Sequence, residues 1–183
     1  MINHIYQLIS PKVFSVKYAD IGGEGKIIVR PSYLAVCHAD QRYYLGQRDH
    51  KVLAKKLPMA LIHEGCATVL EDASGVFKRG QKVVMIPNVP SGRDEIIYEN
   101  YAEGSHFLSS GYDGFMRELV DLPADRLVPY DNIPDKLAAI TEFVSVAVHA
   151  ATRFALASHK RKDIITVWGD GSLSYTVCCV LKT

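Results

Sequence analysis

The stretch Ile164–Tyr175 reads IITVWGDGSLSY and decides how the carboxyl-terminal part of this 183-residue chain is interpreted. Residues 164–168 form an unbroken apolar run, which is typical of a strand buried on both faces of a sheet. Two glycines follow, and residues 172–183 then read as an apolar helix. A strand, a glycine-bearing turn and a helix in this order predict the first part of a β-α-β unit. The chain stops before a second strand, so we expect the unit to be incomplete.

The turn carries the pattern Gly169-x-Gly171-x-x-Ser174. Gly169 would allow a tight turn, and Gly171 would let a pyrophosphate approach the backbone where Ser172 and Leu173 open the helix. The dinucleotide-binding fingerprint has Gly or Ala at its third position, so Ser174 departs from it. An ordinary strand-to-helix turn is the alternative interpretation. The acidic residue expected about 20 positions further on lies beyond the last residue.

The region before this unit contains a long helical pattern. Residues 135–157 include no Gly or Pro and are apolar on most faces, which predicts one or two buried helices with His149 in the core. Residues 158–163, SHKRKD, predict a solvated basic turn after them.

The residues before 135 favour strands. The pattern predicts strands at Val13–Tyr18 and Lys26–Arg30 on either side of the glycine turn 22–25, and again at 61–70 and 82–86 around the charged turn 77–80. Residues 87–110 are polar and weakly periodic, which predicts a long lobe or loop. The predicted fold class is therefore mostly β with helices.

Composition places the chain among ordinary folded proteins and excludes several partners. Hydrophobic residues make up 48 % and charged residues 22 %. The 21 basic and 20 acidic residues give a net charge of +1, which supplies no field to attract nucleic acid or an anionic membrane. No apolar stretch approaches the roughly 20 residues of a membrane span, and the amino terminus lacks the features of a signal peptide. We expect a cytoplasmic protein with its four cysteines reduced.

Three separated positions carry the ligand types that Zn²⁺ accepts. They are Cys37, the pair His63-Glu64, and Glu142. A catalytic zinc site uses three such ligands and keeps one position open for water or substrate. The spacing between Cys37 and His63 is not that of a zinc finger, and a free cysteine is also a common core residue. The residues alone leave both a metal site and a structural role open.

The motifs follow the order of a known family. They are CHAD at 37–40, LIHEG at 61–65, FKRGQKVV at 77–84, TEFVSVAVHA at 141–150 and the glycine turn after residue 168. In this order they resemble the zinc-dependent medium-chain alcohol and polyol dehydrogenases. Within that superfamily, the strings CHADQRYYLG, LPMALIHEG, VVMIPNVP, ENYAEG, SSGYDGFM and VWGDGSLSY look like the bacterial ribulose-5-phosphate reductases, also called ribitol-5-phosphate dehydrogenases.

The resemblance implies a GroES-like catalytic domain over residues 1–150 and an incomplete Rossmann nicotinamide-binding domain over residues 151–183. It implies that Cys37 and His63 bind zinc, that Glu64 or Glu142 is the third ligand, and that these four residues form the catalytic site. Ala39 departs from the family, because many alcohol dehydrogenases carry Ser or Thr there to relay the substrate proton. Residues 87–110 contain no cysteine, so we expect one catalytic zinc and no structural zinc.

The implied activity is reduction of D-ribulose 5-phosphate to D-ribitol 5-phosphate with NADPH, for the synthesis of CDP-ribitol and ribitol-containing wall or capsule polymers. The nearest candidates to bind the sugar phosphate are Arg42, Tyr43 and Tyr44. A surface ion pair for Arg42 and core packing for the two tyrosines are the alternatives.

The apolar strand at 164–168 lacks a partner strand, so we expect it to pair between chains in a homo-oligomer rather than to pack on its own catalytic domain. The resemblance implies a functional pairing with a CDP-ribitol cytidylyltransferase. Two other functions stay open. One is another zinc-dependent polyol dehydrogenase, and the other is a truncated, non-catalytic GroES-like module. Because members of the superfamily are considerably longer, we expect this fragment to be inactive alone.

Overall fold

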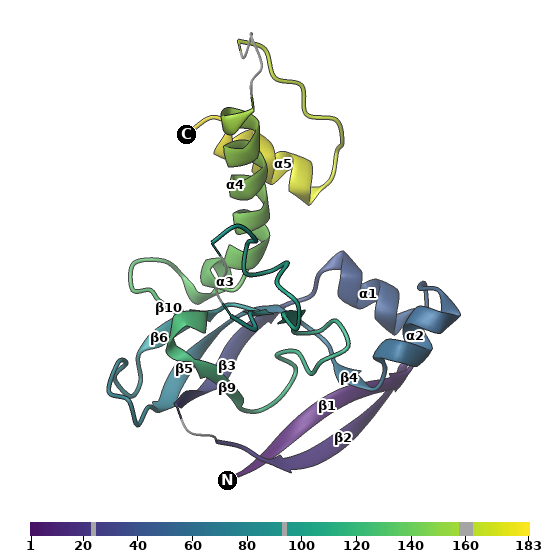
Figure 1. The fold of residues 1–183 in the computed structure, drawn as a ribbon, viewed down its shortest axis with the longest axis vertical. Coiled ribbons are helices and arrows are strands. Elements are labelled where there is room, and N and C mark those ends of the chain that lie inside the picture. Colours follow the sequence, from purple (N-terminus) through teal and green to yellow (C-terminus); the bar gives the residue numbers. More distant parts are fainter. Residues whose placement is uncertain (23–24, 93–94, 158–162) are drawn as a thin grey trace.

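The computed structural model describes residues 1–22, 25–92, 95–157 and 163–183. Part of the predicted glycine turn, at 23–24, and most of the predicted basic turn, at 158–162, lie outside the described residues. Two antiparallel sheets form the body of the molecule (Figure 1). The smaller has the order β2-β1-β4, from β1 (Ile2–Ser10), β2 (Val13–Asp20) and β4 (Met59–Ala60).

The larger sheet has five strands in the order β10-β6-β5-β3-β9. These are β3 (Lys26–Ala35), β5 (Glu64–Glu71), β6 (Lys82–Met85), β9 (Val120–Pro123) and β10 (Leu127–Pro129). Its main core consists of apolar side chains from this sheet and the segments that cover it, among them Val29, Val69, Met85, Phe115 and Leu122. The predicted mostly β fold is confirmed.

The predicted strands at 13–18 and 26–30 are confirmed, but they belong to different sheets. Strand β1 was not predicted, because polar residues such as Asn3 and Gln7 interrupt its apolar alternation. The Asn3 side chain is nevertheless buried, since its amide group donates to the carbonyl of Leu119 and accepts from its N–H. A satisfied buried amide therefore occupies an inward-facing strand position.

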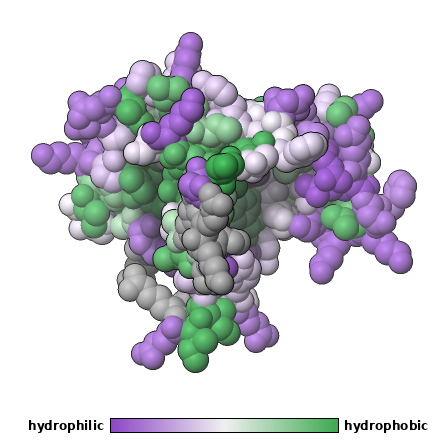
Figure 2. Space-filling view, turned by 90° about the horizontal axis from the view of Figure 1, so that it is seen from above, coloured by the Kyte–Doolittle hydropathy of each residue, from purple (hydrophilic) through white to green (hydrophobic). Residues whose placement is uncertain are grey.

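Short helices connect the two sheets. Helices α1 (His38–Tyr44) and α2 (His50–Lys56) lie between β3 and β4, and hydrophilic side chains gather over this side of the molecule (Figure 2). The predicted lobe at 87–110 contains only the small ribbon of β7 (Asn88–Val89) and β8 (His106–Phe107) among its described residues. A 3₁₀ turn, η1 (Ala124–Arg126), joins β9 to β10.

The carboxyl-terminal helices extend away from the sheets (Figure 1). They are α3 (Asp135–Ala138), α4 (Thr141–Leu156) and α5 (Ser172–Val180), and α5 packs along α4. Of the one or two helices predicted at 135–157, the structure has two, α3 and α4, but the predicted burial is wrong: in α4 only Ala147 is buried, and His149 is exposed. An apolar helix is buried only where another element covers it, and over most of α4 the described residues place nothing but α5.

The predicted strand at 164–168 is also wrong. These residues form neither helix nor strand, and Trp168 is 96 % exposed. A β-strand exists through its hydrogen bonds to a neighbour, and none of the described residues pairs with this segment. The helix that follows, α5, is where the sequence predicts it. No described helix is long and apolar enough to cross a membrane.

Candidate metal centre

The amino-terminal end of α1 fixes the position of the Cys37 thiol. Cys37 is the N-cap residue, and its sulfur accepts a hydrogen bond from the Asp40 N–H at 3.5 Å. In return, Asp40 Oδ2 accepts from the Cys37 N–H at 3.1 Å and from its thiol at 3.0 Å. This reciprocal arrangement is a capping box in which Cys replaces the usual Ser or Thr. The thiol is therefore held at the junction of β3 and α1.

The Asp40 carboxylate joins this junction to two other segments. Its Oδ1 accepts from the Ile62 N–H at 2.9 Å and from the Ser109 hydroxyl at 3.1 Å. Ile62 has a φ of 71°, a left-handed conformation that is strained for a β-branched residue. The carbonyl of Ile62 accepts from the Phe115 N–H at 2.6 Å, so both backbone groups of Ile62 are held. The neighbouring residue, His63, is thereby turned toward Cys37.

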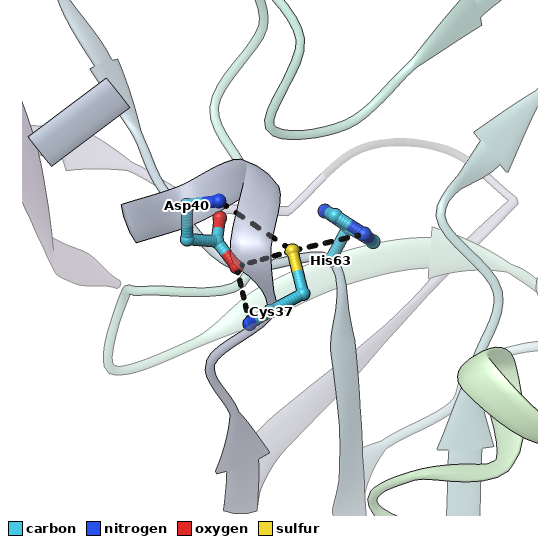
Figure 3. Close-up of side chains that lie close together, drawn as sticks. All are labelled: Cys37, Asp40 and His63. Carbon is cyan, nitrogen blue, oxygen red and sulfur yellow. Dashed lines mark hydrogen bonds between the residues drawn. The ribbon is translucent and has the colours of Figure 1, made fainter. Parts of the chain in front are cut away.

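The imidazole of His63 faces the thiol directly (Figure 3). His63 Nε2 lies 3.7 Å from Cys37 Sγ, and the edge of the ring contacts Phe107 at a centroid distance of 5.2 Å. A tetrahedral zinc ion with ordinary bond lengths separates a sulfur and a nitrogen ligand by about 3.5 Å. His63 Nδ1 is buried without a hydrogen-bond partner among the described residues. The spacing of sulfur and nitrogen thus fits a shared zinc ion.

Two glutamates complete the cluster. His63, Glu64 and Glu142 place a ligand atom each within 4.8 Å of one another, and so do Cys37, Asp40 and His63. Glu64 begins β5 and is 4 % exposed, whereas Glu142 is half-buried in the first turn of α4. His63 belongs to both groups, so its ring lies near the Cys37 thiol and also near the two glutamates. All four residues implied by the resemblance thus lie around His63; their binding of a metal stays a prediction.

Burial and neighbouring negative charges in the cluster disfavour the ionised forms of Glu64, Glu142 and Cys37. Burial, and then the negative charges of Glu142 and Asp40, raise the pKa of Glu64 to about 7. Burial also raises the pKa of Glu142, against the opposing effect of His63. Burial and the hydrogen bond to Asp40 raise the pKa of the Cys37 thiol to about 12. A divalent cation would relieve these penalties, because it favours the ionised forms of all three groups. The donor set therefore fits Zn²⁺.

Comparison with known proteins identifies the family. The pattern of the alcohol dehydrogenase GroES-like domain matches residues 23–135, more than half of the chain. The chain belongs to the alcohol dehydrogenase GroES-like family. The matched residues of this GroES-like domain include the capped Cys37, the strained turn before His63, and Glu64.

The most informative relatives of the GroES-like domain are bacterial reductases. The chain is 58 % identical over its whole length to the ribulose-5-phosphate reductase of Streptococcus pneumoniae, and 48 % identical to that of Bacillus spizizenii; it covers 54 % of each. The structure of Staphylococcus aureus TarJ in complex with NADPH matches with a TM-score of 0.80 and 41 % identity, over 100 % of this chain and 50 % of that one. The chain thus spans about half the length of the curated relatives it matches.

More distant neighbours show the fold alone. Escherichia coli L-idonate 5-dehydrogenase matches the whole chain and 54 % of its own with a TM-score of 0.86 at 22 % identity. The expectation of a medium-chain dehydrogenase with a GroES-like domain is therefore confirmed for the fold. The boundary predicted at residue 150 stays untested, and α4 runs through it without a break.

The glycine turn predicted to bind the pyrophosphate lies at the start of α5. Gly169 has a φ of 138°, and Gly171 is the N-cap of α5, so both glycines occupy the turn that the sequence predicts. Ser172 and Leu173 open the helix, and all four residues are exposed. Their contact with a dinucleotide stays a prediction.

The three candidates for phosphate binding lie on α1 in different surroundings. Tyr43 is 4 % exposed in a second core cluster with Leu8 and Leu61, which matches the core-packing alternative. Tyr44 stacks on Phe14 at the surface, and the Arg42 Nε donates to the carbonyl of Gln47. The structure thus shows no shared anion site for these three residues, and their role in phosphate binding stays a prediction.

Asp40 is the functional residue to which the sequence analysis gave no role. The sequence signal for it was the Cys-x-x-Asp spacing of a capping box. Its contact with Ile62 is long-range and could not be read from spacing.

Proposed function

We propose that this chain forms the zinc-binding half of a reductase that converts D-ribulose 5-phosphate to D-ribitol 5-phosphate with NADPH. One observation carries the proposal: the thiol of Cys37 and the carboxylates of Glu64 and Glu142 all approach His63, in a chain that is 58 % identical to a protein named ribulose-5-phosphate reductase. The structure of TarJ in complex with NADPH supports the choice of cofactor.

The proposed site divides its work among a few residues. Bound zinc would supply a Lewis acid for the ketone oxygen, while the nicotinamide would provide the hydride. Cys37 and His63 would hold the ion, and Glu64 or Glu142 would provide the third ligand. Asp40 keeps the thiol and the histidine turn in place.

A proton must reach the new alkoxide, and Ala39 offers no hydroxyl to deliver it. Burial raises the pKa of both Glu64 and Glu142, so the glutamate that does not bind the ion is suited to deliver the proton. The residues 169–173 are the part of this chain that we propose to approach the dinucleotide.

Metal analysis tests the site directly. The 183-residue chain, purified without chelator, is expected to contain close to one zinc ion, and Cys37→Ala is expected to lose it because a thiolate ligand is gone. Cys178→Ala is the matched control, since that thiol is exposed on α5. Zinc content that does not differ between Cys37→Ala and the control, or a chain without zinc, would contradict the assignment.

Activity tests the substrate. The chain can be completed with the part of the Streptococcus pneumoniae reductase that it does not cover, and the oxidation of NADPH can be followed by absorbance. We expect turnover with ribulose 5-phosphate and much less with unphosphorylated ribulose. Preferential turnover of another polyol or sugar phosphate would favour a different polyol dehydrogenase.

A further inference from the structure

The proposed ligands come from two parts of the molecule. Cys37, His63 and Glu64 belong to the β body, whereas Glu142 lies on α4. Helix α4 contacts β5, but it projects from the body in Figure 1 and buries only Ala147. The short helix α3 before it adds further contacts that bear on the position of Glu142.

Asp135, the first residue of α3, is bound to three neighbouring positions on the large sheet. Its Oδ1 accepts from the Lys82 ammonium at 2.7 Å, on β6, and from the Tyr130 hydroxyl at 3.0 Å, directly after β10. Its backbone carbonyl accepts from the buried Cys66 thiol at 3.4 Å, on β5. One residue thus ties the start of α3 to three adjacent strands, β10, β6 and β5.

The link from Asp135 to Glu142 is short and hydrogen-bonded. The Asp135 carbonyl also accepts from the Ala139 N–H at 2.9 Å, and the Thr141 hydroxyl donates to the Ala138 carbonyl at 2.8 Å. Ala138 and Ala139 are buried against Cys66 and the neighbouring Val84. The turn between α3 and α4 therefore transmits the position of Asp135 to the first turn of α4.

The register of β5 makes this anchor relevant to the metal centre. Cys66 and Glu64 are two residues apart on one strand, so their side chains leave the same face of the sheet. Cys66, which binds the Asp135 carbonyl, and Glu64, a proposed ligand, are therefore neighbours on one face of β5. Glu142, in the first turn of α4, lies within reach of Glu64 and His63.

We infer that Asp135, held by Lys82 and Tyr130, is a positioning residue that sets Glu142 at the metal centre. The inference rests on the proposed function, since it takes the cluster to be a zinc site. Asp135, Lys82 and Tyr130 are not proposed ligands, yet the inference predicts that changing Asp135 weakens zinc binding. It also predicts that this loss requires Glu142 and largely disappears when Glu142 is replaced.

Zinc affinity, measured by competition with a chromophoric chelator, tests this in a double-mutant cycle. Asp135→Asn is expected to weaken zinc binding about tenfold in the unsubstituted chain, as the loss of an orienting partner does at metal sites. In a Glu142→Gln background the same change is expected to alter affinity less than about twofold. Equal effects in the two backgrounds, or no effect in either, would overturn the inference.

Lysine variants separate positioning from general stability. Lys82→Met should weaken zinc binding, because it removes the positive charge that pairs with Asp135. Lys82→Arg should leave zinc binding close to that of the unsubstituted chain, because it keeps the charge. Lys26→Met is the matched control: Lys26 pairs with Asp121 at 2.9 Å, and its side chain is 48 % exposed against 51 % for Lys82. Both pairs are surface ion pairs, which contribute little to folding. A loss of zinc affinity in Lys26→Met equal to that in Lys82→Met would refute a specific role.

Hydrogen exchange adds a readout that needs no metal. Amides of residues 137–145 are expected to exchange faster in Asp135→Asn than in Lys26→Met, and unchanged exchange overturns the inference. If the unsubstituted chain binds no zinc, the proposed function fails and the positioning role falls with it. If zinc binds but the cycle shows no coupling, only the positioning role fails.

Discussion

Replacing Glu64 with glutamine tests whether the buried cluster penalises negative charge as the geometry indicates. Glu64 is 4 % exposed and faces the carboxylates of Glu142 and Asp40, and its pKa of about 7 compares with 4.5 for an ordinary glutamate. Between these two values the folded chain holds a proton that the unfolded chain has released. The free energy of unfolding of the metal-free chain should therefore fall as the pH rises from 4.5 through 7.

The size of this fall follows from the two pKa values. Each tenfold change in proton affinity corresponds to about 1.4 kcal/mol, so the difference between 4.5 and about 7 amounts to about 3 kcal/mol at pH 8. Glutamine keeps the shape of the side chain but cannot ionise. Relative to the unsubstituted chain, Glu64→Gln should gain up to about 3 kcal/mol between pH 5 and pH 8.

Urea unfolding in the presence of EDTA, at several pH values from 5 to 8, measures this gain. The range stops at pH 8 because above it the Cys37 thiol ionises in the unfolded chain but not in the folded chain, where its pKa is raised to about 12, and this would add a second pH dependence. Glu71→Gln is the control, since Glu71 is exposed at the other end of β5. Parallel pH dependences for Glu64→Gln and the unsubstituted chain would refute the reasoning. Added zinc should reverse the trend, because the ionised carboxylate is the form that binds it.

Two further changes test other parts of the structure. A Cβ at Gly114 would lie 2.5 Å from the carbonyl oxygen of Leu61, so Gly114→Ala should lower the free energy of unfolding by about 2 kcal/mol or more in urea titrations. At Gly171 an added Cβ would meet no neighbouring atom within 4 Å, so Gly171→Ala should change the free energy of unfolding by less than about 0.5 kcal/mol. If the two substitutions lowered the free energy of unfolding equally, the close approach at Gly114 would be contradicted. Trp168, the only tryptophan, is 96 % exposed beside Ile164 and Ile165, which are also exposed, so we expect association through this segment to shift its emission to the blue as concentration rises. A monomeric mass by light scattering with constant emission would speak against the predicted homo-oligomer.

Local patterns predicted the local features of this protein. Strands appear at 13–18 and 26–30 as predicted, the strand predicted at 61–70 begins only at Glu64, and that predicted at 82–86 ends at Met85. The region 135–157, for which one or two helices are predicted, holds α3 and α4, and the helix after Gly171 also appears. The helix N-terminus at Cys37 was not predicted, although the Cys-x-x-Asp spacing at 37–40 is a local capping signal for it. Such features depend on the conformation of a few consecutive residues, and that conformation is what hydrophobic period and capping residues report.

The motif order in the sequence also led to the four proposed ligands, but through resemblance and not through spacing. Nothing in the distance between residues 37, 63 and 142 along the chain states that Cys37 and Glu142 both approach His63. The arrangement includes the strained turn at Ile62, the carboxylate of Asp40 that spans two segments, and the ion pair between Lys82 and Asp135. The last two are contacts between residues far apart in sequence.

Burial and strand pairing were decided by the tertiary structure alone. The apolar run at 164–168 has the composition of a central strand, yet a strand requires a partner, and the described residues place none beside it. The apolar faces of α4 are exposed for the same reason. By itself the sequence determined which segments are able to form strands, helices and caps. Only the three-dimensional packing decided which of them are covered, which are paired and which donors converge, because those outcomes depend on neighbours that a local pattern does not contain.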